Sequence, residues 1–432
     1  MVVPRFCPYR ACSRHTLSGV RAWSFPGRWF RPRGFYYTDT YGWVKRFHCC
    51  SCGRSFSEST FRLDYFVKRR LSYQRIEQAL TSCSGLRAIG RTLGCSVDSV
   101  SNRISRLSRQ YISAHSSLIT TVRLREPLAA DGFQSFAVSQ YYPNNIHLLC
   151  GADSQLVYDL DYVTIRRTGA MSESQRLMRL ALEIFYRASP KGITRSFRRI
   201  VTSVSRLCAT VAPGDPRLPL IPFRTDCKRE YAVELKRNRC IDRLMTDHRF
   251  EHQRISSRRH RDYANPLFAV NYLDREIRKD LAEHVRETTR FARNVNNSME
   301  RMWLYLAVHN YRKRHRINPP AELPEAERGR VHAQVAGFTR SAIEATLASI
   351  HTRRRFLSLS PVRGCARITW QRLYHTPLRG VDRTVLRRVK RLVARSTTDV
   401  TALVQEIAGS AGAGISRTAS RSREYLPAYA IA

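Results

Sequence analysis

The sequence has few acidic residues, no long apolar run and few cysteines for its length. Asp and Glu number 34 among 432 residues, against 75 Lys and Arg, which gives a formal net charge of +41. Such an excess of one sign destabilises a compact chain through self-repulsion unless a polyanion neutralises it. Most of the excess is arginine, whose planar guanidinium makes bidentate contacts to phosphate and guanine. The composition therefore favours a nucleic-acid partner over a loose membrane-surface role.

The features that the sequence lacks also limit the classes of protein to which it can belong. No apolar run approaches the length of a membrane span, and the N-terminal residues show no signal-peptide pattern because Pro4 and Arg5 interrupt it early. Twelve scattered cysteines are too few for a disulfide scaffold in a chain of this length. We therefore expect a cytoplasmic, nucleoid-associated protein with reduced thiols, no membrane contact and room for two or three domains.

Four cysteines nevertheless occur as two close pairs, Cys7, Cys12, Cys49 and Cys52. The second pair has C-x2-C spacing and is followed by Gly53, as zinc-knuckle turns commonly require. Two thiolate pairs brought together form a tetrahedral site that suits structural Zn²⁺. Cys50 has the wrong spacing to be a preferred ligand. We expect residues 1–60 to form a zinc ribbon of short strands; the alternative is a set of free buried thiols.

Residues 61–125 show helical periodicity with one break. Within residues 85–107, Gly94 can supply the positive φ of a tight turn and Ser96 can cap the next helix. The pattern predicts a helix-turn-helix with residues 97–107 as the recognition helix. Its outward polar residues include four candidates for contacts with base edges, Ser99, Asn102, Arg103 and Arg106. The alternative is an ordinary pair of antiparallel helices.

Three short strands are expected in residues 128–167, and a helix is expected at 172–187. Asp131, followed by Gly132, lies on the first strand. Residues 146–150 form the apolar second strand, and residues 156–167 form the third. Turn residues 143–145 and 151–154 separate the strands. A strand holds a carboxylate rigidly, as a nuclease-type metal site requires, provided that further acids come from elsewhere in the chain.

Two further carboxylates complete this hypothesis. Asp226 ends a predicted buried strand at 218–226, which a helix at 227–239 and a basic, loop-like stretch at 240–270 should follow. A long helical region begins near Asn271. At about 100° per residue, its apolar face contains Leu273, Ile277, Leu281, Val285, Ala292 and Val295. Asp274 projects into that face, either as a metal ligand or in the simpler role of compensating the helix N-terminus.

The other acids of this region belong to a different face. Glu276, Asp280, Glu283 and Glu287 form a stripe about 120° away from the apolar face by the same arithmetic. Interleaved with Arg and Lys, such a stripe is most simply a solvated face. Residues 319–432 form an Arg-rich extension, with helices expected at 325–350 and 381–394 and a disordered tail from 409 onward. Three carboxylates on two strands and a helix could together hold two Mg²⁺ or Mn²⁺ ions.

The order of these features resembles bacterial insertion-sequence transposases of the DDE type. The matching segments are CGRSFS at 52–57, RAIGRTLGCSVDSVSNRI at 87–104, DGFQSF at 131–136, RTD at 224–226 and LDREIR at 273–278. The resemblance implies an α/β catalytic core with a ribonuclease H-like fold at 126–318, preceded by the zinc ribbon and the all-α helix-turn-helix. It also implies cleavage and strand transfer on double-stranded DNA, at element ends and target, by a homo-oligomer.

The resemblance places the first and second catalytic aspartates on Asp131 and Asp226. The family's third acid is usually Glu before Arg, and here that position is Asp274 followed by Arg275. Glu300, Glu276 and Glu287 are alternatives for it. Two other functions are compatible with the sequence: a DNA-binding regulator with a non-catalytic core, and a metal-dependent nuclease that cuts DNA without joining strands.

Overall fold

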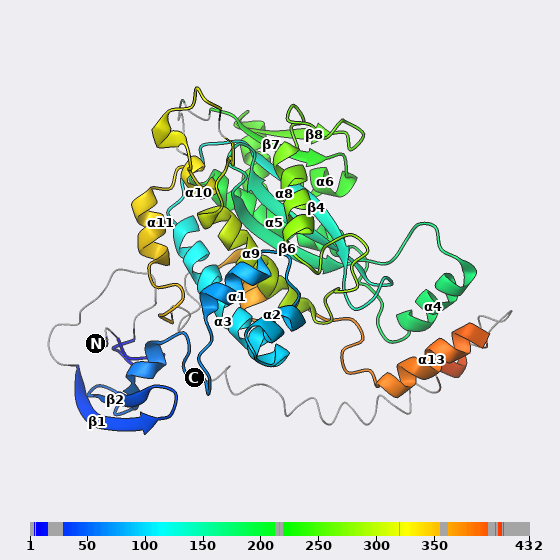
Figure 1. Ribbon diagram of the computed structural model, residues 1–432. Coiled ribbons are helices and arrows are strands. Elements are labelled where there is room, and N and C mark those ends of the chain that lie inside the picture. The colour runs from blue at the N-terminus through cyan, green and yellow to red at the C-terminus, as the bar shows by residue number, and fades with distance from the viewer. Residues whose placement is uncertain are drawn as a thin grey trace.

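The computed structural model describes residues 4, 6–15, 29–211, 216, 219–318, 320–354, 362–395, 402, 405–407 and 409. Within these residues the chain is an α/β protein with a three-stranded antiparallel sheet, a five-stranded mixed sheet and surrounding helices (Figure 1). The predicted disordered tail lies outside the described residues from 410 onward.

The five-stranded sheet contains the predicted three strands and two more. β4 (Leu128–Phe136), β5 (Pro143–Gly151) and β6 (Val157–Thr164) form an antiparallel meander. β7 (Ile221–Asp226) and β8 (Phe250–Ile255) continue the sheet beside β4, both parallel to it, in the order β6-β5-β4-β7-β8. The meander is therefore extended on the side of its first strand, and β4 occupies the centre of the sheet.

Two local predictions about these strands were wrong. Residues 143–145 belong to β5 rather than to the turn, because the first hairpin connection lies at residues 137–142. β8 was expected to be loop, since FEHQRI is polar and shows little alternation. β8 is an edge strand with only Phe250 buried, so its sequence lacks the apolar pattern of a central strand.

Helices cover both faces of this sheet. Gly132 pairs with His147 and Phe133 pairs with Ile146, so these neighbouring pairs point to opposite faces. His147 bonds to Ser196 of α5 (Gly192–Cys208) and to Tyr231 of α6 (Arg229–Arg237) on one face. On the other face, Arg278 of α8 (Phe268–Asp280) lies over the Phe133 ring at 4.7 Å.

The predicted recognition helix is much longer than expected. α1 (Tyr73–Leu80) and α2 (Leu86–Thr92) precede α3 (Val97–Ile119), whose second half is almost entirely buried. α3 packs against α9 (Val295–Arg312), as Figure 1 shows. One hydrophobic core runs from Leu63 through the sheet to Tyr374. The predicted boundaries near 126 and 319 therefore do not separate independently packed cores.

The helical region after residue 271 is broken, which overturns the predicted acidic stripe. α8 ends at Asp280, α9 begins at Val295, and Val285 between them is 38% exposed instead of lying on an apolar face. Glu276 and Glu283, expected to face solvent, are each only 6% exposed. Glu276 pairs with Lys279 and Lys313, and Glu283 pairs with Arg301, because a buried carboxylate requires a cation partner.

The N-terminal unit has a small core of its own. β1 (Phe30–Thr38), β2 (Gly42–Cys49) and β3 (Ser55–Ser57) form the antiparallel sheet, followed by η1 (Glu58–Phe61). Trp29, Phe47 and Phe56 pack together with Cys7, Cys12 and Cys49. The expected short strands of residues 1–60 are therefore present among the described residues, at the lower left of Figure 1. The expected segment also included residues 16–28, which lie outside the described residues.

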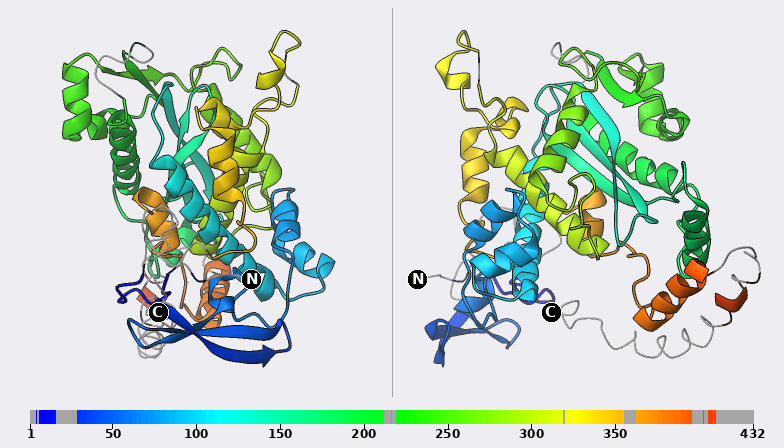
Figure 2. Two further views of the ribbon diagram at one scale, coloured as in Figure 1. Left: turned by 90° about the vertical axis from the view of Figure 1, so that its left-hand side faces the viewer. Right: turned by 45° about the vertical axis from the view of Figure 1, so that its right-hand side comes forward.

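A second small unit joins distant parts of the chain. α4 (Glu173–Glu183) packs against α13 (Arg383–Arg395) through Leu177, Ala181, Val389 and Val393, apart from the main core (Figure 2). The helix expected at 325–350 is instead three short elements. The remaining elements are α7 (Arg239–Thr246), η2 (Glu325–Glu327), α10 (His332–Val335), α11 (Arg340–Leu347) and α12 (Gly364–Trp370).

Candidate active site and metal centre

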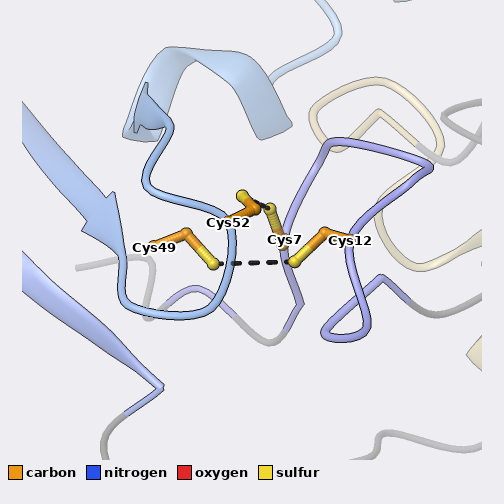
Figure 3. A group of neighbouring side chains, drawn as sticks. All are labelled: Cys7, Cys12, Cys49 and Cys52. Atoms are coloured by element: carbon orange, nitrogen blue, oxygen red, sulfur yellow. Dashed lines mark hydrogen bonds between the residues drawn. The ribbon is translucent and has the colours of Figure 1, made fainter.

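The four predicted cysteines lie together. Cys49 and Cys52 flank the turn after β2, and Cys7 and Cys12 approach from the N-terminal segment (Figure 3). The Sγ atoms of Cys7 and Cys52 are 3.7 Å apart, as are those of Cys12 and Cys49. All four sulfurs lie within 4.8 Å of one another. Gly53 has φ +68° and its N–H donates to the Cys49 carbonyl at 3.0 Å, which closes the turn.

This arrangement fits a tetrahedral zinc ion. Four sulfurs each about 2.3 Å from one zinc would lie about 3.8 Å from one another, close to the observed pair distances. Burial raises the pKa of the Cys7 thiol. For Cys49, burial acts in the same direction, but backbone N–H groups of Cys52 and Ser51 outweigh it and lower the pKa. Cys50 is exposed and does not belong to this group, as expected.

α2 and α3 are joined by a short turn, as the predicted helix-turn-helix requires. Gly94 in the turn has φ +58°, and the Ser96 side chain accepts the Ser99 N–H at 3.2 Å as the N-cap of α3. A Cβ on Gly90 would lie 2.8 Å from the Cys95 carbonyl oxygen, so only glycine lets the turn pack this closely on α2.

The side chains chosen as base readers do not all face outward. Arg103 is only 7% exposed and donates to the Arg69 carbonyl at 3.0 Å. Arg106 donates to the Leu63 and Tyr65 carbonyls at 3.1 and 2.6 Å. The expectation that Arg103 faces outward is wrong, because both arginines tie α3 to the segment before α1. Of the other two candidates, Asn102 is exposed and Ser99 is half-buried.

Asp131 and Asp226 lie on neighbouring parallel strands. β4 and β7 pair Leu128 with Phe223, an offset of 223 − 128 = 95 residues, and the same offset relates Asp131 to Asp226. The Lys228 ammonium lies between the two carboxylates, 3.0 Å from Asp226 Oδ2 and 3.7 Å from Asp131 Oδ1. The structure thus brings the two predicted aspartates to one cation.

Local contacts fix Asp131 and Lys228. The Asp131 Oδ1 atom accepts the Gly132 N–H at 2.7 Å. A Cβ at Gly132 would lie 2.1 Å from Asn145 Oδ1 on β5, which explains glycine after the aspartate. Lys228 also donates to the Tyr231 hydroxyl at 3.3 Å, and Tyr231 is fully buried between α6 and the sheet.

Asp274 lies on α8, on the same side of the sheet as Asp131. Burial, together with the negative charge of Asp131, raises the pKa of the Asp274 carboxyl to about 7. Burial also raises the pKa of Asp131, against the opposing effect of Lys228, and the Asp226 charge raises it further. Arg261 lowers the pKa of both Asp131 and Asp274. Asp131 therefore interacts electrostatically with both Asp226 and Asp274. Among the described residues, the four cysteines are the only group of potential metal ligands whose ligand atoms all lie within 4.8 Å of one another.

The alternative third acids lie in other surroundings. Glu300 on α9 accepts from Ser105 at 2.8 Å and Arg372 at 2.6 Å, so it links α3 to the C-terminal region. Glu276 is held by Lys279 and Lys313. Glu287 is exposed, in the connection between α8 and α9. None of the three is among the largest causes of the pKa shifts of Asp131 and Asp274, whereas Asp131 is among those of Asp274, so Asp274 is the acid placed with the pair.

Lys228 and Arg261 are site residues that sequence reasoning missed. Lys228 follows Asp226 by two positions, and a cation close behind a candidate catalytic aspartate could have been a signal. Arg261 belongs to the basic stretch at 240–270, where nothing distinguishes it from its many arginine neighbours. The end of β7 and the start of α6 place Lys228, whereas the position of Arg261 depends on how the chain returns from β8 to α8.

Comparison with known proteins adds no assignment, since no family model and no curated protein matches the chain. Among the described residues, no helix combines the length and apolar character needed to cross a membrane.

We expect the purified chain to contain about one zinc per molecule, held by the four cysteines. Cys49→Ser and Cys52→Ser should each lose the metal and lower the melting temperature, because metal binding stabilises the small ribbon core. Cys50→Ser is the matched control and should keep both. Elemental analysis with thermal melting measures the outcome; full metal content in Cys49→Ser protein would contradict the assignment.

Arg103→Ala should destabilise the fold instead of changing sequence preference. Losing charged hydrogen bonds to the Arg69 carbonyl and Asn102 should cost about 1–3 kcal/mol of unfolding free energy. Arg91→Ala, at an exposed position on α2, should change stability by less than about 0.5 kcal/mol. Denaturant melts of the two variants test this; equal stabilities would show that the Arg103 contacts contribute nothing.

Proposed function

We propose that the chain is a DDE-type DNA transposase that cleaves element ends and transfers them to target DNA. The observation that carries the proposal is the placement of Asp131 and Asp226 on neighbouring parallel strands, with Asp274 of the following helix α8 interacting electrostatically with Asp131. Their order along the chain and the elements that hold them agree with what the family resemblance implies. The rival acids Glu300 and Glu276 are engaged in structural ion pairs instead.

We further propose that the five-stranded sheet is a ribonuclease H-like domain. A three-stranded antiparallel meander, extended beside its first strand by two parallel strands, supports this assignment. In this arrangement Asp131 lies on the central strand and Asp226 at the carboxyl end of its neighbour. Ligands of α/β sheets bind at the carboxyl ends of the strands, which is where the proposed chemistry is located.

The donor set fits hard divalent cations. The three residues offer only carboxylate oxygens, which suit Mg²⁺ or Mn²⁺, and the position between Asp131 and Asp226 already accommodates the positive charge of Lys228. Two such ions, when bound, supply an activated water or 3′-hydroxyl and stabilise the leaving oxygen. Asp131 and Asp226 would hold them from the sheet, and Asp274 from α8 after losing its proton.

The charge around the carboxylates supports DNA as the substrate. Arg258, Arg259 and Arg261 are exposed in the segment between β8 and α8. Arg261 acts electrostatically on both Asp131 and Asp274, so this basic segment borders the site. Phosphates can therefore be bound by arginine beside the carboxylates while the zinc-ribbon and helix-turn-helix units bind other parts of the DNA. We place this activity on chromosomal DNA in the cytoplasm, in a homo-oligomer.

Asp131→Asn, Asp226→Asn and Asp274→Asn should each reduce Mg²⁺-dependent cleavage and strand transfer to background while DNA binding persists. Each change removes one ligand charge and leaves the ribbon and α2–α3 untouched. The measurement uses duplexes taken from the two flanks of the coding region, where a transposase predicts inverted repeats, with cleavage and joined products resolved on gels.

Two control variants test whether the loss is specific to the three aspartates, and the products formed separate the competing functions. Asp242→Asn, at an exposed acid on α7, should leave both reactions intact, and Glu300→Gln should lower stability without abolishing them. Cleavage without joined products would identify a nuclease. DNA binding with no metal-dependent reaction in the unaltered chain would identify a regulator and overturn the proposal.

A further inference from the structure

Three exposed aromatic rings gather on one face of the N-terminal hairpin. Phe35 and Tyr37 on β1 are 60% and 61% exposed, and Trp43 on β2 is 73% exposed. The register pairs Tyr37 with Trp43 and Phe35 with Lys45, so these four side chains lie on the same face of the hairpin. The Tyr37 and Trp43 ring centroids are 5.6 Å apart. We call Phe35, Tyr37 and Trp43 the ring platform.

The platform lies where the ribbon core ends. Along β2, Phe47 and Cys49 share the face of Trp43, since successive side chains alternate. Phe47 is 3% exposed and Cys49 is fully buried, whereas Trp43, near the hairpin turn, is open. β1 and β2 form the outer edge of the molecule in both views of Figure 2, away from the five-stranded sheet. The rings therefore lie beyond the ribbon core, and they are exposed because the hairpin tip extends past the residues that pack in that core.

The hairpin that carries the platform is held firmly. Tyr41 in its turn donates to the Asp64 carbonyl at 2.7 Å. The Arg62 and Arg70 guanidinium groups lie 4.3 and 4.5 Å from the Tyr41 ring centre, on the segment that leads into α1. Cation–π contacts and a hydrogen bond thus fix the platform relative to the helices of the proposed helix-turn-helix.

The charge of the hairpin identifies the kind of partner. Lys45 shares the face of the rings, and the opposite face of the same strands carries exposed Arg31 and Arg46. In the described part of the chain none of these three cations is paired with a carboxylate. Open aromatic faces on a hairpin of unneutralised cations repel basic partners and attract phosphate chains. Rings stack on nucleobases only where the base faces are uncovered, because a duplex already covers them. The combination fits a nucleic-acid strand with unpaired bases.

We propose that the ring platform binds single-stranded DNA by stacking unpaired bases on Trp43, Tyr37 and Phe35, while Lys45 beside them and the other cations of the hairpin attract the phosphates. This site is separate from the carboxylates and does not depend on their chemistry. A chain without any cleavage activity would still bind unpaired DNA here. The platform gives the protein a way to recognise frayed or opened DNA in addition to duplex sequence.

The test compares a labelled single strand of about twelve nucleotides with its blunt duplex, using the full zinc-containing chain and fluorescence anisotropy. Trp43→Ala and Tyr37→Ala should each weaken single-strand binding at least about fivefold, from the ordinary strength of base–ring stacking. Duplex binding should change less than about twofold. Trp43→Phe should restore most of the lost affinity, and Lys45→Ala should lower the salt dependence of single-strand binding by about one phosphate contact.

The control is Leu373→Ala, which removes a 65% exposed apolar side chain elsewhere and should change neither affinity. Zinc content and melting temperature confirm that each variant is folded. Equal losses for single strand and duplex, or no loss for either ring variant, would overturn the proposal. If the ring variants instead convert a dimer to a monomer with unchanged single-strand binding, the face is an interface between two copies of the chain.

Discussion

The parallel pairing of β4 with β7 is the constraint on which the candidate site depends. It joins segments 95 residues apart and sets the offset that relates Asp131 to Asp226. Burying carboxylates and bringing them close to one another are both unfavourable, and the raised pKa values of Asp131 and Asp274 express that cost, with burial the larger cause. Lys228 and Arg261 offset part of it. The chain as a whole has a net charge of +41, yet its sheet concentrates negative charge at one place. Cations bound near these carboxylates stabilise that arrangement.

The large arginine excess serves two physical roles. Some arginines are exposed on the hairpin, on α2 and beside the carboxylates, where they can contact phosphate. Others hold the frame: Arg103 and Arg106 attach α3 to the preceding segment, Arg301 neutralises Glu283, and Arg372 neutralises Glu300. Net charge therefore overstates the basic surface available to a polyanion, and judging which arginines could contact phosphate requires their burial and their partners as well as the residue type.

The helices of residues 73–119 connect the separate parts of the molecule. α3 packs on α9, the core runs without interruption into the sheet, and Tyr41 fixes the ribbon hairpin to the segment before α1. The ring platform, the turn between α2 and α3 and the carboxylates thus belong to parts of the molecule that are packed or hydrogen-bonded to one another. This geometry suits a protein that binds an extended polyanion at several places along its length.

The sequence alone determined the features that depend on local spacing. Two cysteine pairs with a following glycine predicted a four-sulfur site, runs of residues between turn signals predicted β4, β5 and β6, and Gly94 with Ser96 predicted the turn before α3. Asp131 and Asp226 could be singled out because one lies on a predicted strand and the other ends one. These signals persist in the sequence because residues near one another along the chain fix turns, caps and strand faces.

Only the tertiary structure decided which charged side chains are structural. Arg103 and the acids Glu276 and Glu283 have the helical spacing of exposed residues but are buried against segments distant in sequence. The sequence also did not predict the break after Asp280 or the edge strand β8, because both depend on the elements that pack beside them. Periodicity reports which way a side chain points from its own element. Burial and charge pairing depend on the neighbours that folding supplies.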